Sequence, residues 1–235
     1  MNTADTVLAF TLEEKSVRAA LIGEEGKEVL AAAAPLGSLT LEEIHTGLQK
    51  AFAGLAEALG EPVREIRGLV IHDRLRGFIP FDRTWQSLGP FRNAATADTG
   101  DTAAYLSGLF ETEIGPESSI AHLLLAMRQG EEGLDFLNHI ATPGIWLYRQ
   151  MTGNHAADRA DAWGIFPLLP DGSDYDPDLQ ARFNALVEAD GYPWRLQHLL
   201  PEIRPSGEPI GTLTPEGAFF IDPACRLHPG APVLG

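Results

Sequence analysis

Hydrophobic residues in the first third of the chain follow strand and helix patterns in turn. Apolar runs at 7–10, 16–22 and 27–31, with a turn at 23–26 between the last two, predict a meander of three strands. Between 41 and 59, apolar residues recur at helical spacing, with Ser38 and Thr40 as candidate caps and Gly60 as a stop. The β-branched run at 66–71 then predicts a buried central strand. A meander, a crossover helix and a returning strand indicate an α/β layer.

Helical patterns dominate the rest of the chain. No repeat or long polar linker divides it, so we expect a single domain over 1–235. The pattern predicts a short edge strand at 78–81, helices at 98–110, 120–130 (capped by Ser118 and Ser119), 131–137, 143–153, 178–188 and 193–200, and a terminal strand at 208–213, after which four prolines forbid long regular elements.

The net charge of the chain limits the classes of partner that it is expected to bind. The sum is −16, from 17 Lys+Arg and 33 Asp+Glu, which disfavours nucleic acid and anionic lipid. No apolar run approaches the roughly 20 residues that span a bilayer, and the first ten residues lack the basic region of a secretion signal. Cys225 is the single cysteine, so no internal disulfide forms. We therefore expect a cytoplasmic protein with a small neutral substrate or a protein partner, and with neither nucleic acid nor membrane as a partner.

Six stretches, in order, carry a resemblance to a known family. They are 16–21 with 24–26, 92–93 with Thr96, 119–122, 146–153, 161–167, and 206–208 with 211–217. They resemble the N-terminal domain of the FGGY carbohydrate kinases, in the sugar-kinase, hexokinase and actin superfamily. The resemblance covers nearly the whole chain. It implies a ribonuclease-H-like (actin-like ATPase) α/β domain with a helix-rich second half, and one sugar-binding lobe over 1–235 without the C-terminal nucleotide-binding lobe.

The activity that this resemblance implies is phosphoryl transfer from MgATP to a hydroxyl of a ketose or polyol, a transferase reaction of carbohydrate metabolism. The family's catalytic Asp follows a Pro-rich approach and is expected beyond Gly235, so no catalytic residue is assigned within the chain. We expect the truncated lobe to be inactive alone. ATP and Mg are expected only with a C-terminal lobe, and no cofactor or metal for this chain by itself. Besides the carbohydrate, the candidate partners are a C-terminal lobe in trans and a second copy bound through the inter-lobe face.

The first hairpin departs from the family pattern. Where the family has Asp-x-Gly-Thr-Thr-Ser for phosphate and metal, this chain has residues 11–16, so Thr11 replaces the metal-binding Asp. Lys15 and Ser16 remain as phosphate contacts, but Glu13 and Glu14 would face a triphosphate. The sequence therefore predicts a degenerate phosphate hairpin.

The resemblance also implies a sugar site. Arg92 and Asn93 would bond to sugar hydroxyls and Phe91, a Trp in the family, would stack on the sugar. Arg76 and Asp161 complete the predicted substrate-binding residues. The alternative for Arg92 is an ion pair with a nearby carboxylate. The lining differs from the family pattern, because Trp163 stands where the family has a small residue.

Two further groups of polar residues leave alternatives open. His72, Asp73 and Arg76 follow the predicted central strand, at the end where ligands tend to bind. Asp73 would serve there as a replacement base or, alternatively, pair with Arg74 or Arg76 in a solvated loop.

His155, Asp158 and Asp161 are spaced by three residues and are conceivable metal ligands, but Asp161 is better explained as a helix cap or a residue at the rim of the cleft.

After the central strand the family tends to have Ser-Gly-x-x-His-Gly, and in residues 72–77 of this chain only the glycine, Gly77, is retained. This departure and the one in the hairpin support a second hypothesis. A non-catalytic, kinase-like module for protein interaction or regulation would retain the fold while losing these motifs.

Overall fold

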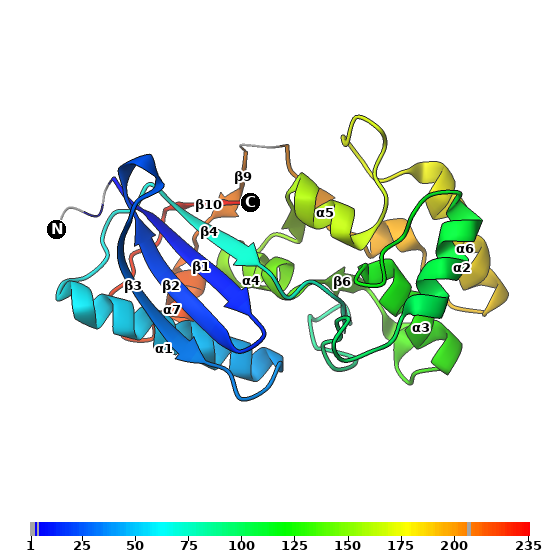
Figure 1. Cartoon of the computed structure of the whole chain (residues 1–235), viewed down its shortest axis with the longest axis horizontal. Helices are drawn as coiled ribbons and strands as arrows, with labels where there is room; N and C mark the ends of the chain where they lie inside the picture. Colours follow the sequence, from blue (N-terminus) through cyan, green and yellow to red (C-terminus); the bar gives the residue numbers. More distant parts are fainter. Residues whose placement is uncertain (1–2, 4, 206–207) are drawn as a thin grey trace. The chain divides into compact units, whose positions relative to one another are not determined.

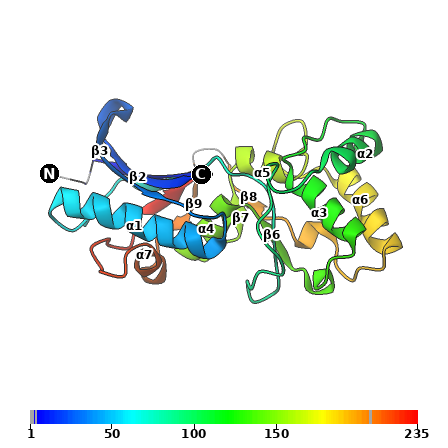
Figure 2. The same cartoon turned by 60° about the horizontal axis from the view of Figure 1, so that its bottom comes forward.

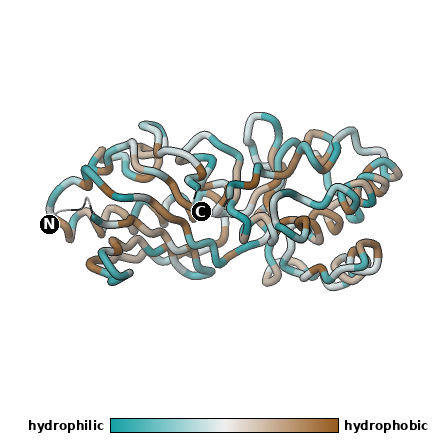
Figure 3. Tube along the Cα trace, turned by 90° about the horizontal axis from the view of Figure 1, so that it is seen from above, coloured by the Kyte–Doolittle hydropathy of each residue, from teal (hydrophilic) through white to brown (hydrophobic). Residues whose placement is uncertain are grey.

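The computed structural model describes residue 3 and residues 5–205 and 208–235. Residues 206–207, part of one stretch that carries the family resemblance, lie outside the described residues. The chain forms two compact units. Unit 1 comprises Met1–Leu75, Trp146–Ala156 and Ser206–Gly235, and unit 2 comprises Arg76–Ile145 and Ala157–Pro205. Apolar stretches run through the strands and helices of each unit (Figure 3). Among the described residues, no helix is both long and apolar enough to cross a bilayer.

Unit 1 is built on a mixed sheet of six strands (Figure 1). The predicted meander pairs antiparallel, and β4 returns parallel to β1, which confirms the α/β fold expected from the sequence. The antiparallel pair β9–β10, whose strands are connected through α7, then extends the sheet, with β10 parallel to β4. The sheet order is β3-β2-β1-β4-β10-β9, and the bounds are β1 (Val7–Glu13), β2 (Ser16–Ile22), β3 (Glu28–Pro35), β4 (Gly68–Asp73), β9 (Pro209–Thr212) and β10 (Pro232–Leu234).

Helix α1 (Leu41–Leu59) lies against β2 and β3, and α7 (Pro215–Ile221) packs beside it on the same face of the sheet (Figure 2). The Thr40 hydroxyl accepts a hydrogen bond from the Glu43 amide, and Gly60 ends the helix with a φ of 76°. Leu48 and Phe52 are fully buried. The helix therefore forms because its sequence supplies both caps and an apolar face. A third helix of unit 1 is α4 (Pro143–Thr152), which falls mostly within it.

Unit 2 consists mainly of helices, with short strands. Its largest helices are α2 (Gly100–Phe110), α3 (Ser119–Gln129) and α6 (Pro177–Ala189), close to the predicted ranges. The short strand β5 (Ile79–Phe81) pairs antiparallel with β6 (His139–Ala141). The remaining elements in chain order are η1 (Glu24–Gly26) in unit 1, η2 (Leu134–Phe136), β7 (Ala156–Ala157), α5 (Arg159–Ile165), η3 (Leu196–His198) and β8 (Glu202–Ile203).

One predicted helix was wrong, and the prediction for the C-terminal region was incomplete. The helix expected at 193–200 is only the single turn η3 (Leu196–His198). The strand at 208–213 is not terminal, because β10 follows it. Proline-rich sequence after it still forms α7, since Pro215 occupies the first turn, where no amide is needed, and the Thr214 hydroxyl accepts a hydrogen bond from the Gly217 amide.

Candidate functional site

The carboxyl ends of two parallel strands bring the predicted phosphate hairpin and Asp73 to one edge of the sheet in unit 1. Thr11 pairs with His72 across β1 and β4, and Leu12 pairs with Asp73. Asp73 Oδ1 accepts a hydrogen bond of 2.8 Å from the Leu75 amide, which holds the carboxylate against its own loop. Open α/β sheets bind ligands here, at the carboxyl ends of their strands.

The hairpin between β1 and β2 is closed by its own side chains. Ser16 Oγ donates a 3.1 Å hydrogen bond to Glu13 Oε2, and Arg74 Nη1 lies 3.4 Å from Glu13 Oε1. Arg74 thus pairs with Glu13. The turn residues Glu14 and Lys15 both have negative φ, so the hairpin lacks the left-handed geometry of a phosphate-binding nest. Two carboxylates and an internally bonded serine do not fit a triphosphate with its metal, and we assign no nucleotide site to this hairpin.

Phe91 and Arg92, two of the predicted sugar residues, lie beside Gly77. Backbone hydrogen bonds join Phe78 and Arg92 in both directions, at 2.8 and 3.0 Å. Gly77 has a φ of 97°, and a Cβ placed there would lie 2.0 Å from the Arg92 carbonyl oxygen and 2.9 Å from the Phe91 ring. The one glycine retained from the family's motif is therefore required by close packing of the two segments. Phe91 is 7% exposed, so most of its ring contacts protein.

Arg92 and Asn93 each make polar contacts within unit 2, although Arg92 Nη1 is buried without a hydrogen-bond partner among the described residues. Arg92 Nη2 lies 2.5 Å from Glu131 Oε2, which is the ion pair that the sequence left open as an alternative. Asn93 is 5% exposed, and its Oδ1 accepts hydrogen bonds from the Ala95 amide at 3.1 Å and from Thr96 Oγ1 at 3.3 Å. The structure thus places these residues in the interior of unit 2, and their role in sugar binding stays a prediction.

Arg92 also affects a buried histidine of α3. His122 is fully buried, and neither ring nitrogen has a hydrogen-bond partner among the described residues. Burial lowers the pKa of His122 to about 4, and the positive charge of Arg92 adds to the effect. The imidazole is therefore neutral at physiological pH and adds no charge to this part of unit 2.

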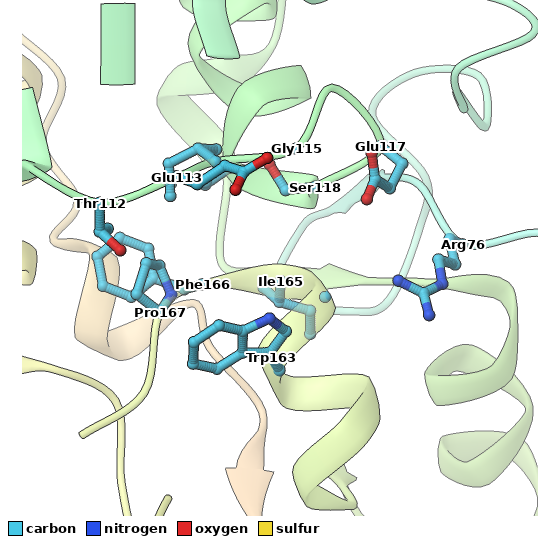
Figure 4. A pocket seen from close by; sticks show the side chains of 13 residues that line it. Arg76, Thr112, Glu113, Gly115, Glu117, Ser118, Trp163, Ile165, Phe166 and Pro167 are labelled. Atoms are coloured by element: carbon cyan, nitrogen blue, oxygen red, sulfur yellow. The ribbon is translucent and has the colours of Figure 1, made fainter. Parts of the chain in front are cut away.

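A cavity of about 80 Å³ opens in unit 2 beside α5 (Figure 4). Trp163 lies across it from Glu113 and Ser118, while Arg76 and Glu117 stand at one end. Of the predicted substrate-binding residues, only Arg76 lines this cavity. Phe91, Arg92, Asn93 and Asp161 do not. The full lining is Arg76, Thr112, Glu113, Ile114, Gly115, Glu117, Ser118, Ile120, Trp163, Gly164, Ile165, Phe166 and Pro167.

Local backbone features position the cavity residues. Arg76 has a φ of 49° and precedes Gly77, so two consecutive left-handed residues turn the chain at the cavity end. Asp158 caps α5 by accepting a 2.7 Å hydrogen bond from the Asp161 amide, and α5 carries Trp163. The cap is thus Asp158, with Asp161 in the first turn. In the described part of the chain, no group of three or more His, Cys, Asp or Glu residues is arranged to hold a metal ion.

Sequence reasoning noted Trp163 only as a departure from the family, took Ser118 only as a helix cap, and did not identify Glu117. A tryptophan at a position where the family has a small residue was the available signal. Ser118 and Glu117 carry no comparable signal, because their place beside the cavity depends on the tertiary fold.

Comparison with solved structures shows what this fold is similar to. Xylulose kinase from Rhodospirillum rubrum matches 98% of this chain and 48% of its own, with 19% identity and a TM-score of 0.79. Gluconate kinase from Lactobacillus acidophilus matches 97% and 47%, with 12% identity and a TM-score of 0.75. Glycerol kinase from Plasmodium falciparum, solved with ADP, matches 98% and 48%, with 16% identity and a TM-score of 0.74.

The chain thus spans about half the length of these kinases and resembles their N-terminal domain, as the sequence predicted. No protein-family model and no curated protein sequence matches the chain. At these identities the likeness establishes the actin-like ATPase fold.

Proposed function

We propose that this chain is the sugar-binding lobe of a cytoplasmic carbohydrate kinase of the FGGY type, a single N-terminal lobe over 1–235. The fold carries the proposal, because nearly the whole chain superimposes on one half of several sugar kinases. The sheet supports it, since β1 and β4 end together at the edge where Asp73 lies. The cavity of unit 2 adds polar groups and an exposed aromatic face, which is the lining that a carbohydrate needs.

The reaction proposed is phosphoryl transfer to a hydroxyl of a ketose or polyol. The hairpin of unit 1 does not fit a triphosphate. A second lobe would therefore have to supply the binding site for the nucleotide and its metal, and the catalytic base. Within this chain, the residues would bind and orient the sugar only. We therefore expect the isolated chain to bind sugar without catalysing phosphorylation.

Isothermal titration tests the binding half of the proposal. The purified chain is titrated with D-xylulose, D-fructose, xylitol and glycerol up to millimolar concentration. We expect saturable binding of at least one compound at one site per chain. The absence of heat from all four compounds, with the chain shown by circular dichroism to be folded, would contradict the proposed function.

A non-catalytic interaction module is the second candidate. Glu13 and Arg74 favour it, because their ion pair closes the hairpin where the kinases of this family are expected to hold phosphate. Under this alternative, a C-terminal kinase lobe added in trans restores no phosphorylation of any sugar that the chain binds. Measured turnover in the mixture, by coupled ADP release, would exclude the alternative.

A further inference from the structure

Trp163 is an unusual surface residue. Its side chain is 59% exposed, whereas Trp146 and Trp194 are each 7% exposed. It lines the cavity of unit 2 together with Ile165 and Phe166 (Figure 4). An exposed indole at the wall of a cavity presents a flat apolar face to any molecule that enters.

The opposite wall is polar. Ser118 Oγ is buried and has no hydrogen-bond partner among the described residues, although Ser118 occupies the cap position of α3. A buried hydroxyl without a hydrogen-bond partner destabilises the folded state, and a hydrogen bond from a ligand hydroxyl would remove this penalty. At one end of the cavity, the Arg76 guanidinium supplies donors and the Glu117 carboxylate supplies acceptors.

A polyol matches this combination. Each of its hydroxyl groups both donates and accepts hydrogen bonds, so it can satisfy a guanidinium, a carboxylate and a serine at once. Its carbon-bound hydrogens form an apolar face that can lie against an indole. Charges of both signs at the cavity favour an uncharged ligand over one with a strong net charge.

The volume limits how much of the ligand enters. A cavity of about 80 Å³ has room for only a few water-sized groups. The cavity therefore accepts one end of an open-chain polyol, and the remainder of the ligand would extend over the exposed face of Trp163.

We propose that Trp163 is the stacking wall of the sugar subsite and that Ser118 Oγ binds a ligand hydroxyl opposite it. The inference rests on the proposed function and gives a binding role to two residues that were not among the predicted substrate-binding residues. Trp163 and Ser118 are specificity-determining residues in this proposal and take no part in the chemistry.

The test compares sugar affinity among four variants of the full chain. Trp163→Ala removes the stacking face and Trp163→Phe retains one. Ser118→Ala removes a hydroxyl that makes no capping hydrogen bond, so folding is preserved. Phe136→Ala is the matched control, because Phe136 is an exposed aromatic residue of unit 2, at 72%, outside the cavity. Each is titrated with whichever of D-xylulose, D-fructose, xylitol and glycerol binds the wild type most tightly.

We expect Trp163→Ala to weaken binding at least about tenfold and Trp163→Phe by less than about threefold. Ser118→Ala should weaken binding about three- to tenfold, and Phe136→Ala less than twofold. Bound sugar should also protect wild-type tryptophan fluorescence from acrylamide, and this protection should vanish in Trp163→Phe.

The outcomes separate the two proposals. Sugar binding by the wild type that persists unchanged in Trp163→Ala and Ser118→Ala overturns this inference and leaves the proposed function standing. Binding lost equally in Phe136→Ala also overturns it, because the effect would then be unrelated to the cavity. No binding by the folded wild type contradicts the proposed function and this inference with it.

Discussion

Replacing His122 by leucine should make the stability of the protein less sensitive to acid. The wild-type imidazole is fully buried without a hydrogen-bond partner among the described residues, and burial, with the charge of Arg92, lowers its pKa to about 4 from 6.5. Leucine is close in volume and carries no polar atom. His122→Leu therefore removes a buried titratable group without opening a large cavity.

The direction of this pH dependence follows from how many protons the folded and unfolded states bind. Between pH 6.5 and 4 the unfolded chain holds a proton on His122 and the folded chain does not, so the free energy of unfolding falls as the pH falls. The folded-state pKa of about 4 and the reference value of 6.5 give a loss of about 2 kcal/mol between pH 7.5 and pH 5. The loss approaches about 3 kcal/mol at still lower pH.

Urea denaturation of wild type and His122→Leu, followed by circular dichroism at half-unit steps from pH 7.5 to 5, measures this loss. The other titratable groups are common to both proteins, so the difference between the two curves isolates His122. His198→Gln, at an exposed histidine, is the control and should differ from wild type by less than about 0.5 kcal/mol throughout. Parallel curves for wild type and His122→Leu would refute the reasoning.

Three further tests, of an ion pair, of packing and of capping, use the same urea titration at pH 7.5, the first two with a matched control variant. Glu131→Gln should lower the free energy of unfolding by about 1–3 kcal/mol, because it leaves the Arg92 guanidinium largely buried without its counter-ion. Arg74→Gln removes one partner of an exposed ion pair and should lower it by less than about 0.5 kcal/mol. Equal losses in the two variants would contradict this prediction. Gly77→Ala should cost at least about 2 kcal/mol, since its Cβ would meet a backbone carbonyl, while Gly89→Ala has room and should cost less than about 1 kcal/mol. Thr40→Ala should cost about 1 kcal/mol through the lost cap of α1, and an unchanged midpoint would show that the cap contributes nothing.

Local signals explain which elements could be predicted. Helix α1 was predicted with its bounds because its caps, Thr40 and Gly60, and its apolar spacing lie within twenty residues of one another. The segment at 193–200 has apolar residues at helical spacing, yet it forms only a single turn. Helix α7 was missed because Pro215 was taken as a breaker, although proline is favoured in a first turn.

Tertiary contacts explain why the candidate site was harder to predict. Arg76 lines the cavity because of a left-handed turn, and this turn has no clear signature in the sequence. Asn93 carries the right chemistry for sugar binding, but the structure shows its side-chain oxygen engaged by Ala95 and Thr96. A polar residue in sequence can serve its own turn as readily as a ligand, and only the folded structure shows which.

The strand order of unit 1 also bears on how the chain is made. β4 lies between β1, near the start of the chain, and β10, which comes after all the other strands. During synthesis, the first four strands leave the ribosome long before β10, so one side of β4 stays an open edge in the meantime. Val233 of β10 is fully buried in the finished sheet. The nascent sheet should therefore be a substrate for chaperones, and closing it should be among the slow, late steps of folding.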